Sequence, residues 1–566
     1  MFDGDCRFCR LWVGYWQSQT GSRVEFAPWQ SALVRFPEVP ERDCRQAVQF
    51  VGPEGRVSGA HAVFAILALM ARYRWLLCLY RHAPGFRAVT EWGYRVVAAH
   101  RNAGYRVTRM LWGQHVAPST YDRPVAWFRR GLAAVYVFAF ASFGMQARGL
   151  IGEKGILPVE LYLRTALVQM GDAARWRVPT LFWWGHSDYL ILTVAWGGVA
   201  IGLVALLARS HSRWYPPLFS LLFVYYLSLV SAGQIFMSFQ WDYLLLEAGF
   251  LGIFLRPSRG RVWLVHWLLF RLMLESGLAK LSSHDPVWRN LTALAFHYQT
   301  QPLPTPLAWY AHQLPLWFQQ VSAAAMFAVE LVTPFLIFGP RKMKQTAAFA
   351  IAGLQLGIAA TGNYTFFNLL TLVLCIPLFD DACWRGKVAA IQAKPARLWL
   401  SVALVSAVLV LSLLGPRPEI AQFGIVNRYG LFATMTTRRD EIRIEGSLDG
   451  ERWEPYIFRD KPGPLNRRPS WVAPFQPRLD WQMWFAALGT IRENPWFAQL
   501  AVGLLQGSEP VKALFEVTPF GTRPKYVRAM VEEYRFTTWA ERSKTGNWWK
   551  AEPRGVYLPP VSLRPQ

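Results

Sequence analysis

The chain has 566 residues, of which 53% are hydrophobic and 15% aromatic, and its formal net charge is +24. It is too long for one ordinary domain and more apolar than most soluble proteins, although a mean hydropathy of only +0.16 requires a soluble part. In the middle of the chain the basic residues stand between long apolar runs, as in the inner loops of membrane proteins. No nucleic-acid-binding motif occurs in the sequence. We therefore expect a lipid bilayer, and no nucleic acid, as the partner.

The first 68 residues are typical of alternating short helices and strands. The stretch CRFCRLWVGYWQSQ predicts a helix with one apolar face, VEFAP predicts a strand, and AVQFVGPEGRVSGAHAV predicts a hairpin followed by a helix. After them, residues 69–125 mix arginine with Trp, Leu and Tyr, which is the pattern of helices that lie on an anionic inner leaflet.

Cys6 and Cys9 stand at the N-terminus of the first expected helix. Backbone N–H groups and the helix dipole stabilise a thiolate there, so the pair is a candidate redox site. An inert, reduced thiol pair in a cytosolic domain is the alternative. A single Cys-x-x-Cys without a second pair makes a poor structural zinc site, so we expect no metal and no cofactor.

About nine membrane-spanning helices are expected, each close to the roughly 20 residues that a bilayer requires. The fourth and eighth are short enough to be tilted or re-entrant. The expected spans are 127–147, 189–208, 216–235, 241–255, 262–281, 317–338, 345–361, 364–379 and 397–415.

The charges of the loops predict the orientation of these spans. Four alternate loops hold 12 Lys and Arg residues, and the other loops hold six. By the positive-inside rule the N-terminus is cytoplasmic, and an odd number of spans then places the C-terminal region outside. No signal peptide is expected, because the first long apolar stretch follows residue 125. All six cysteines precede residue 384, so disulfides cannot hold the outer region.

Residues 416–566 predict a β-rich domain with a helical insertion of two segments. In EIRIEGSLDGERWEPYIFRD two stretches with the two-residue period of a strand flank an Asp-Gly turn, which is a strong signal of a β-hairpin. PWFAQLAVGLLQGS looks helical, while KALFEV and YVRAMVEEYRF look like further strands. Tryptophan beside arginine is typical of binding hot spots, but an ordinary aromatic core explains it equally well. With both alternatives open, the residues that we name as the candidate client-binding group are Trp471, Arg478, Asp480, Trp481 and Trp484.

We place six ionisable residues of the expected spans at membrane depth, where a charge costs about 2.5–3.5 kcal/mol unless it is paired or functional. We expect Arg271 and Glu275, four positions apart, to pair on one helix face. Lys280 either reaches the interface or is tuned by Glu275 for proton transfer. The six are Asp242, Glu247, Arg271, Glu275, Lys280 and Glu330.

The stretch DGDCRFC resembles the Asp-x-x-Cys-x-x-Cys signature of the DCC family of thiol-disulfide oxidoreductase-like proteins, and FAPWQS, GPEGRVSGAHAV and PGFRAVTEWGYRVVAAHR fit the same family. The resemblance covers residues 1–102 and implies a thioredoxin-like fold. It makes Cys6 the attacking thiol, Cys9 the resolving thiol and Asp3 a nearby proton acceptor, with a cytosolic thiol partner. Only Met1 and Phe2 precede the motif where such folds have a central strand, and no proline precedes QAVQF.

A second resemblance covers residues 127–560. GLIGEKGILPVELYL, FQWDYLLLEAGFL, NRYGLFATMT, EIRIEGSLDGERW and RRPSWVAPFQPRLDWQMWFAALG resemble the lipase maturation factor family. It implies a membrane-bound folding factor for exported proteins, with lipases as candidate clients. The fused DCC domain and the absence of a retention tail suggest a bacterial inner-membrane member. We expect a polytopic α-helical membrane protein in four parts: a thioredoxin-like α/β domain at 1–102, a basic interfacial linker at 103–126, a helical core at 127–415 and a β-rich extracytoplasmic domain at 416–566.

The stretch HWLLFRLMLESGLAKL also resembles a helix of vitamin K-dependent γ-glutamyl carboxylases. That resemblance implies an alternative function, an intramembrane enzyme with Lys280 as base and Glu275, His284 and His297 around an outer vestibule. A third hypothesis is that thiol exchange at Cys6 and Cys9 is the chain's only chemistry.

Overall fold

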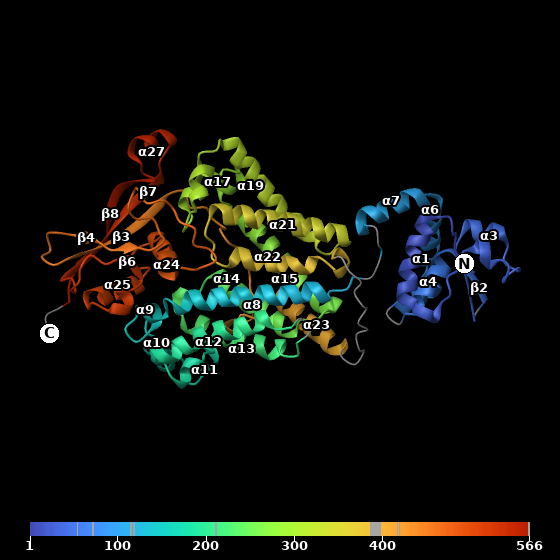
Figure 1. Ribbon diagram of the computed structural model, residues 1–566, viewed down its shortest axis with the longest axis horizontal. Helices are drawn as coiled ribbons and strands as arrows, with labels where there is room; N and C mark the ends of the chain where they lie inside the picture. Colours follow the sequence, from blue (N-terminus) through green and yellow to red (C-terminus); the bar gives the residue numbers. More distant parts are fainter. Residues whose placement is uncertain are drawn as a thin grey trace. The chain divides into compact units, whose positions relative to one another are not determined.

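The computed structural model describes residues 1–53, 55–70, 73–113, 116, 119–209, 212–384, 398–415, 417 and 419–563. Most of the basic loop 384–397 and parts of the linker 103–126 lie outside the described residues. The chain divides into two compact units (Figure 1). The first comprises residues 1–120 with the segments 339–346 and 379–384, and the second comprises 121–338, 347–378 and the described residues from 398 onward.

The first unit contains the cysteine pair and is mainly helical. The expected first helix is present as α1 (Arg7–Thr20), and the expected hairpin is β1 (Gln49–Gly52) with β2 (Gly55–Ser58), followed by α4 (Gly59–Ala68). The remaining helices are α2 (Trp29–Ala32), α3 (Glu41–Gln46), α5 (Arg74–His82), α6 (Phe86–Ala99) and α7 (Arg101–Trp112).

Met1 and Phe2 occupy the place of a central strand, although they are too few to form a regular one. The N–H of Gln49 donates to the carbonyl of Met1 at 3.1 Å, and Phe2 forms a parallel bridge with Pro28. The strand expected in VEFAP is reduced to this bridge, because Pro28 has no N–H for a ladder and α2 begins at Trp29. The hydrogen bonds nevertheless place the thiol motif next to a small sheet-like core.

A helix lies at each of the nine expected spans in the second unit or at its edge. Four of the described helices are long and apolar enough to cross a membrane: α12, α13, α15 and α19 continued by α20. The helix α8 lies between α22 on one side and α12 and α13 on the other (Figure 1). The nine helices are α8 (Asp122–Gly144), α12 (Asp188–Leu207), α13 (Tyr215–Ala232), α14 (Gln240–Phe254), α15 (Arg259–Ser282), α19 (Leu316–Leu331) with α20 (Thr333–Leu336), α21 (Arg341–Thr361), α22 (Phe367–Cys375) and α23 (Leu398–Leu414).

Short helices connect these long ones. They are α9 (Ala147–Ile151), α10 (Val159–Met170), α11 (Ala173–Arg177), α16 (Pro286–Arg289), α17 (Ala293–Thr300) and α18 (Pro306–His312).

The C-terminal part of the second unit is built on an antiparallel sheet with the strand order β4-β3-β7-β8. The expected hairpin is present, with Glu445 opposite Pro455, but its second strand is only two residues long. The strands are β3 (Arg439–Ser447), β4 (Glu454–Pro455), β7 (Tyr526–Phe536) and β8 (Trp549–Val561), and a second sheet pairs β5 (Ile457–Phe458) with β6 (Phe515–Val517). Between β5 and β6 the chain inserts α24 (Arg478–Ala487), α25 (Trp496–Leu505) and α26 (Glu509–Lys512), and α27 (Trp539–Thr545) precedes β8.

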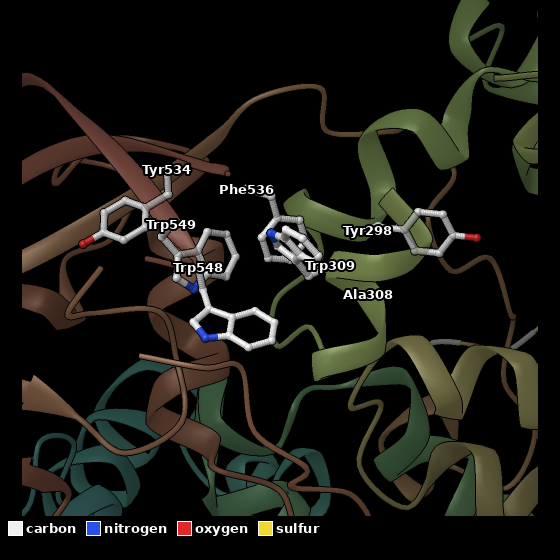
Figure 2. Packing of buried hydrophobic residues seen from close by; sticks show 7 residues of the cluster. All are labelled: Tyr298, Ala308, Trp309, Tyr534, Phe536, Trp548 and Trp549. Carbon is white, nitrogen blue, oxygen red and sulfur yellow. The ribbon is translucent and has the colours of Figure 1, made fainter. Parts of the chain in front are cut away.

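An aromatic cluster joins the sheet to the short helices after α15. Figure 2 shows Trp309 of α18 close to Phe536 of β7 and to Trp548 and Trp549 at the start of β8. Phe536 and Trp549 have ring centroids 4.3 Å apart, and Trp309 and Trp548 are 5.7 Å apart. Aromatic contacts of this kind add to the burial of large apolar surfaces. The C-terminal sheet and the helices therefore share one core.

Candidate functional site

The cysteine pair lies at the start of α1. Cys6 is the N-cap residue of this helix, and the backbone N–H of Cys9 donates to the Cys6 sulfur at 3.3 Å. Both thiols are free and partly exposed. A backbone donor directed at a sulfur at a helix N-terminus is the arrangement that activates cysteines in redox proteins.

The two sulfurs face different surroundings. Cys6 lines a polar cavity, whereas Cys9 lines an apolar cavity of about 360 Å³ together with Trp12, Phe64 and Val97. Burial, reinforced by the hydrogen bond with Cys6, raises the pKa of Cys9 to about 12. Cys9 is therefore a neutral thiol at pH 7, which suits the resolving position better than the attacking one.

Asp3 is held close to the pair by a network. Arg101 donates to Asp3 at 3.1 Å and to the carbonyls of Arg45 and Gln46 at 3.1 and 3.2 Å, and Gln30 donates to the other oxygen of Asp3. The carboxylate is thus fixed by a guanidinium and an amide. Sequence reasoning found Asp3 but missed Arg101, which lies 98 positions further along the chain.

Alkylation should distinguish the two thiols. At pH 7 we expect iodoacetamide to modify Cys6 at least about tenfold faster than Cys9, because only the thiolate reacts. The rate at Cys9 should rise with pH up to about 12, the value to which burial raises its pKa. Mass spectrometry of the peptide that contains both residues, in the single variants Cys6→Ser and Cys9→Ser, measures each rate. Equal rates at pH 7 would contradict the assignment.

A second candidate site is a buried polar joint between the long helices and the C-terminal region. Arg478 of α24 donates to both carboxylate oxygens of Asp242 of α14, at 2.9 and 3.0 Å, and to the carbonyl of Phe236 at 2.6 Å. The side chains of Arg478 and Asp242 are both 0% exposed. Tyr226 of α13 donates its hydroxyl to the same carboxylate. A bidentate arginine–carboxylate pair of this kind fixes both distance and orientation.

Glu247 and Arg271 extend this joint. They form an ion pair between α14 and α15, and Glu247 also accepts from the Tyr429 hydroxyl at 2.8 Å and from the N–H of Asn427 at 2.9 Å. The expected pairing of Arg271 with Glu275 is therefore wrong, because Glu247 on the neighbouring helix is the partner. Glu275 instead accepts from the N–H of Tyr429 at 2.8 Å.

The four residues of the alternative enzymatic site have separate partners. Lys280 is only 5% exposed and donates to both oxygens of Glu330 at 2.9 Å, so it does not reach the interface. Its charge is neutralised by Glu330 and not tuned by Glu275, which corrects both expectations for this lysine. An ion-paired amine is poorly suited to act as a base.

The two histidines of the alternative site also have different surroundings. His284 is exposed and contacts Arg289. His297 is buried beside Tyr364, whose hydroxyl lies 3.1 Å from its Nε2, and burial lowers the pKa of His297 to about 4. His297 is therefore neutral at pH 7. These contacts do not support the hypothesis of an intramembrane enzyme with Lys280 as base.

The candidate client-binding group divides into one exposed and four buried residues. Trp471 is 57% exposed. Arg478 is in the joint, Asp480 accepts from the N–H groups of Asp460 and Lys461, and Trp484 donates to the carbonyl of Thr300. Trp481 packs against Trp241 with ring centroids 4.8 Å apart. For these four the core alternative is correct, because their side chains are at most 7% exposed; the assignment to a binding surface is wrong for them.

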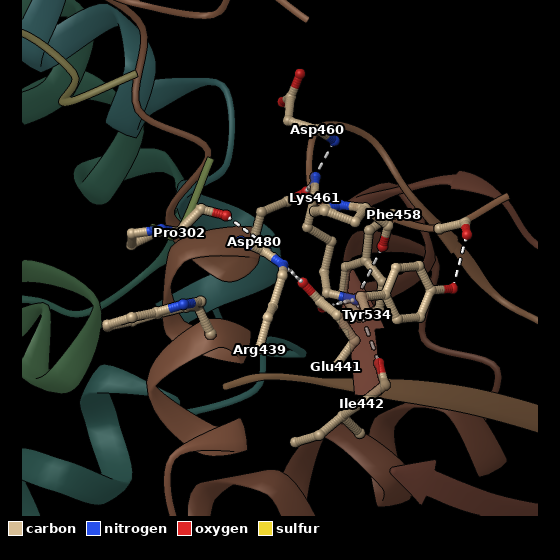
Figure 3. A network of polar contacts seen from close by, with 12 residues as sticks. Pro302, Arg439, Glu441, Ile442, Phe458, Asp460, Lys461, Asp480 and Tyr534 are labelled. Atoms are coloured by element: carbon tan, nitrogen blue, oxygen red, sulfur yellow. Dashed lines mark hydrogen bonds and ion pairs between the residues drawn. The ribbon is translucent and has the colours of Figure 1, made fainter. Parts of the chain in front are cut away.

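Two further buried groups hold the C-terminal region in place, and sequence reasoning missed both. Figure 3 shows Arg439 of β3 directed at Glu441 and at the carbonyl of Pro302, each at 2.8 Å, while Lys461 lies 2.8 Å from Glu441. Asn363, between α21 and α22, accepts from the N–H of Val472 and donates to the carbonyl of Ser470, each at 2.8 Å. Glu441 is only two positions from Arg439, but Pro302 and the partners of Asn363 lie more than 100 positions away, so no local pattern marks these contacts.

The long apolar helices, joined to the C-terminal domain by the buried Asp242–Arg478 ion pair and by hydrogen bonds of Arg439 to carbonyls, define a membrane protein whose C-terminal domain is an integral part of its helical body. Residues 123–386 match the family described as "Lipase maturation factor transmembrane domain", and residues 425–559 match "Lipase maturation factor C-terminal domain". Residues 1–107 match "DCC1-like thiol-disulfide oxidoreductase".

Curated relatives extend these matches. Lipase maturation factor 2 of the mouse is 34% identical over 591 residues, covering 78% of this chain and 83% of the relative, and the human protein is 34% identical, covering 77% and 82%. Lipase maturation factor 1 of cattle is 35% identical, covering 76% and 88%. No solved structure matches. The chain belongs to the lipase maturation factor family and carries a DCC1-like domain at its N-terminus.

These comparisons confirm both family resemblances and a multi-pass membrane protein. The matched relatives are animal proteins, so they do not support the bacterial origin that we inferred from the fused domain.

Proposed function

We propose that this protein is a membrane-bound maturation factor for exported proteins, with lipases as the clients, and that it acts by binding without a covalent change to the client. The similarity to lipase maturation factors, which extends across both the helices and the C-terminal domain, carries this proposal. The buried joint supports it, because the Asp242–Arg478 ion pair and the hydrogen bonds of Glu247 to Tyr429 and Asn427 make these two matched regions one body. A rigid platform of this kind can hold a folding client at the membrane surface.

The proposal includes an orientation. The N-terminal domain lies in the cytoplasm and the C-terminal domain lies outside, on about nine spans, as the 12 basic residues of the inner loops indicate. The fused DCC1-like domain is our reason for assigning the chain to a bacterial inner membrane. In this arrangement the cysteine pair and the client are on opposite sides of the bilayer.

Trp471 is the residue we propose for client contact. Its side chain is 57% exposed, while the backbone around it is anchored by Asn363, which binds Ser470 and Val472 on either side. An exposed tryptophan on a fixed backbone loses little entropy on binding, which is a property of interaction hot spots.

Complementation tests this function. We expect the chain, expressed in animal cells that lack their own lipase maturation factor, to restore the activity of a co-expressed secreted lipase in the medium. Trp471→Ala should lower that activity several-fold, because an exposed hot-spot tryptophan contributes about 2 kcal/mol or more. Trp184→Ala is the matched control, since Trp184 is also exposed, at 83%, and lies far from Trp471 in the sequence.

Immunoblots of the membrane fraction confirm that each variant is present. Secreted lipase protein of normal amount and no activity, with the chain present in the membrane, would contradict the maturation role. The double variant Cys6→Ser/Cys9→Ser should restore lipase activity fully, because the thiols face the cytoplasm in the proposed orientation.

The cysteine pair supports a second candidate function, thiol-disulfide exchange with a cytosolic thiol partner. The position of Cys6 as the N-cap of α1 and the neutral Cys9 thiol favour it. In this reaction Cys6 attacks, Cys9 resolves and Asp3 accepts a proton.

A further inference from the structure

A polar cavity of about 1080 Å³ lies beside Cys6 in the first unit. It is large enough for a small-molecule ligand. Its walls come from the start of α1, the end of α3, α6 and the start of α7, and the cavity is unusually rich in ionisable groups. The charged side chains and the imidazole that line it are Asp3, Asp5, Arg45, Glu91, Arg95, His100 and Arg101.

The acidic groups of the wall already have partners within the unit. Asp3 binds Arg101, and Asp5 accepts from Gln30 at 3.3 Å. Glu91 accepts from the N–H of His61 at 3.2 Å and from the Tyr80 hydroxyl at 2.7 Å. Arg101 compensates the charge of Asp3, while the hydrogen bonds of Asp5 and Glu91 fix the positions of these two carboxylates.

The basic groups are less fully used. The Arg95 guanidinium donates through Nε to the carbonyl of Glu91 at 3.4 Å, a long hydrogen bond, and has no charged partner among the described residues. Arg45 pairs with Glu41 on the same helix, but this pair is largely solvent-exposed, with 69% and 51% of the side chains accessible, and such pairs are weak. Both guanidinium groups are therefore available to an anion that enters the cavity.

The dipole of α7 adds little to this positive field. The residues of its first turn, 101–103, line the cavity, and its N-terminus favours an anion. The helix α6, however, has its C-cap at the residue that caps the start of α7, His100, and its C-terminal dipole opposes this field. The two arginines therefore supply the attraction for an anion in the cavity that Cys6 lines.

We propose that this cavity binds the carboxylates of a small anionic thiol or disulfide, the chemical class of glutathione, and holds its sulfur against Cys6. The proposal rests on the thiol-exchange function of the pair and names its substrate class. Arg45 and Arg95 bind the carboxylates, and Cys6 is the residue that forms a bond with the substrate.

The reaction is an ordinary thiol-disulfide exchange. The Cys6 thiolate attacks one sulfur of the small disulfide, so a Cys6–substrate disulfide forms, the original S–S bond breaks and one small thiolate leaves. Cys9 then loses its proton and attacks the Cys6 sulfur, which releases the second small thiol. Two protein thiols are oxidised to one disulfide, one small disulfide is reduced to two thiols, and the two protons pass from the protein to the products.

Three disulfides test the proposal with the full-length Cys9→Ser variant, in which the mixed disulfide at Cys6 accumulates. Glutathione disulfide is anionic, bis(2-hydroxyethyl) disulfide is neutral and cystamine is cationic. The rate is read as the mass increase of the peptide that contains Cys6. At low ionic strength we expect glutathione disulfide to react about tenfold faster than the neutral disulfide, and the preference to shrink with added salt.

Arginine variants locate the preference. Arg45→Gln and Arg95→Gln should each slow the reaction with glutathione disulfide about fivefold and leave the neutral disulfide unaffected. Arg42→Gln, three positions from Arg45 on α3 and outside the cavity wall, is the control and should change neither rate.

The outcomes separate the two claims. If Cys6 reacts with none of the three disulfides, the thiol-exchange function itself fails. If it reacts with all three at similar rates, or if the arginine variants slow all three equally, thiol exchange stands and the anionic substrate class is overturned.

Discussion

Replacing Arg478 with methionine should destabilise the protein by about 3–5 kcal/mol, because it leaves Asp242 as a buried charge without a cationic partner. Both side chains of this pair are 0% exposed, and the arginine also binds the carbonyl of Phe236. Thermal unfolding of the purified full-length protein, followed by tryptophan fluorescence, measures the loss. We expect the same variant to lose the maturation of secreted lipase, since the joint that holds the C-terminal domain is opened.

A double-mutant cycle provides the control. Asp242→Asn combined with Arg478→Met removes both charges, and we expect this double variant to be more stable than Arg478→Met alone. Similar stability of the single and the double variant would show that the ion pair is not what holds the two elements together.

Gly149→Ala should separate the C-terminal domain from the helices. Gly149 lies in α9, and a Cβ at this position would be 2.3 Å from the carbonyl oxygen of Pro510 and 2.7 Å from Cγ of Leu514. Because the nearer atom is backbone, α9 and α26 must move apart. Overpacking of this kind costs about 1–3 kcal/mol, and we expect the upper end of that range.

Gly353→Ala is the matched control for this prediction. Gly353 lies within α21, and a Cβ there meets no atom within 4 Å. Alanine should therefore raise stability there by up to about 1 kcal/mol, the difference in helix propensity. The melting temperatures of the two variants and the rate at which a protease removes the C-terminal domain are the measurements. Equal behaviour of both variants would refute tight contact at Gly149.

The sequence was sufficient to predict the elements that depend on local pattern. Long apolar runs gave the positions of the long helices, and the hairpin before residue 455 followed from its alternation and its Asp-Gly turn. The strand β8 was not predicted, because prolines such as Pro553 are unusual in strands. In the structure β8 is at the edge of the sheet, where a missing N–H is tolerated.

The partners of the buried charges could not be predicted in the same way. The spacing of Arg271 and Glu275 favoured a pair on one helix, yet Glu247 on another helix is the actual partner of Arg271. Likewise, a run of tryptophans beside an arginine has the same composition on a binding surface and in a core. Which of the two it forms is decided by long-range packing, here by Trp241 and Asp242 on α14. The thiol site was easier to predict, because both cysteines and the helix N-terminus on which they lie belong to one short stretch of the sequence.

The joint between Asp242 and Arg478 also has a consequence for how the protein is made. The two residues are 236 positions apart, so at about 5–20 residues per second Asp242 is synthesised about 10–50 s before its partner. During that interval the helix α14 carries carboxylates whose partners in the C-terminal domain do not yet exist. Synthesis therefore passes through a state in which α14 is complete before the charge of Asp242 is neutralised, and a chain truncated before α24 would remain in that state. In such a truncated chain Asp242 would lack its arginine, whereas Glu247 would keep its ion pair with Arg271.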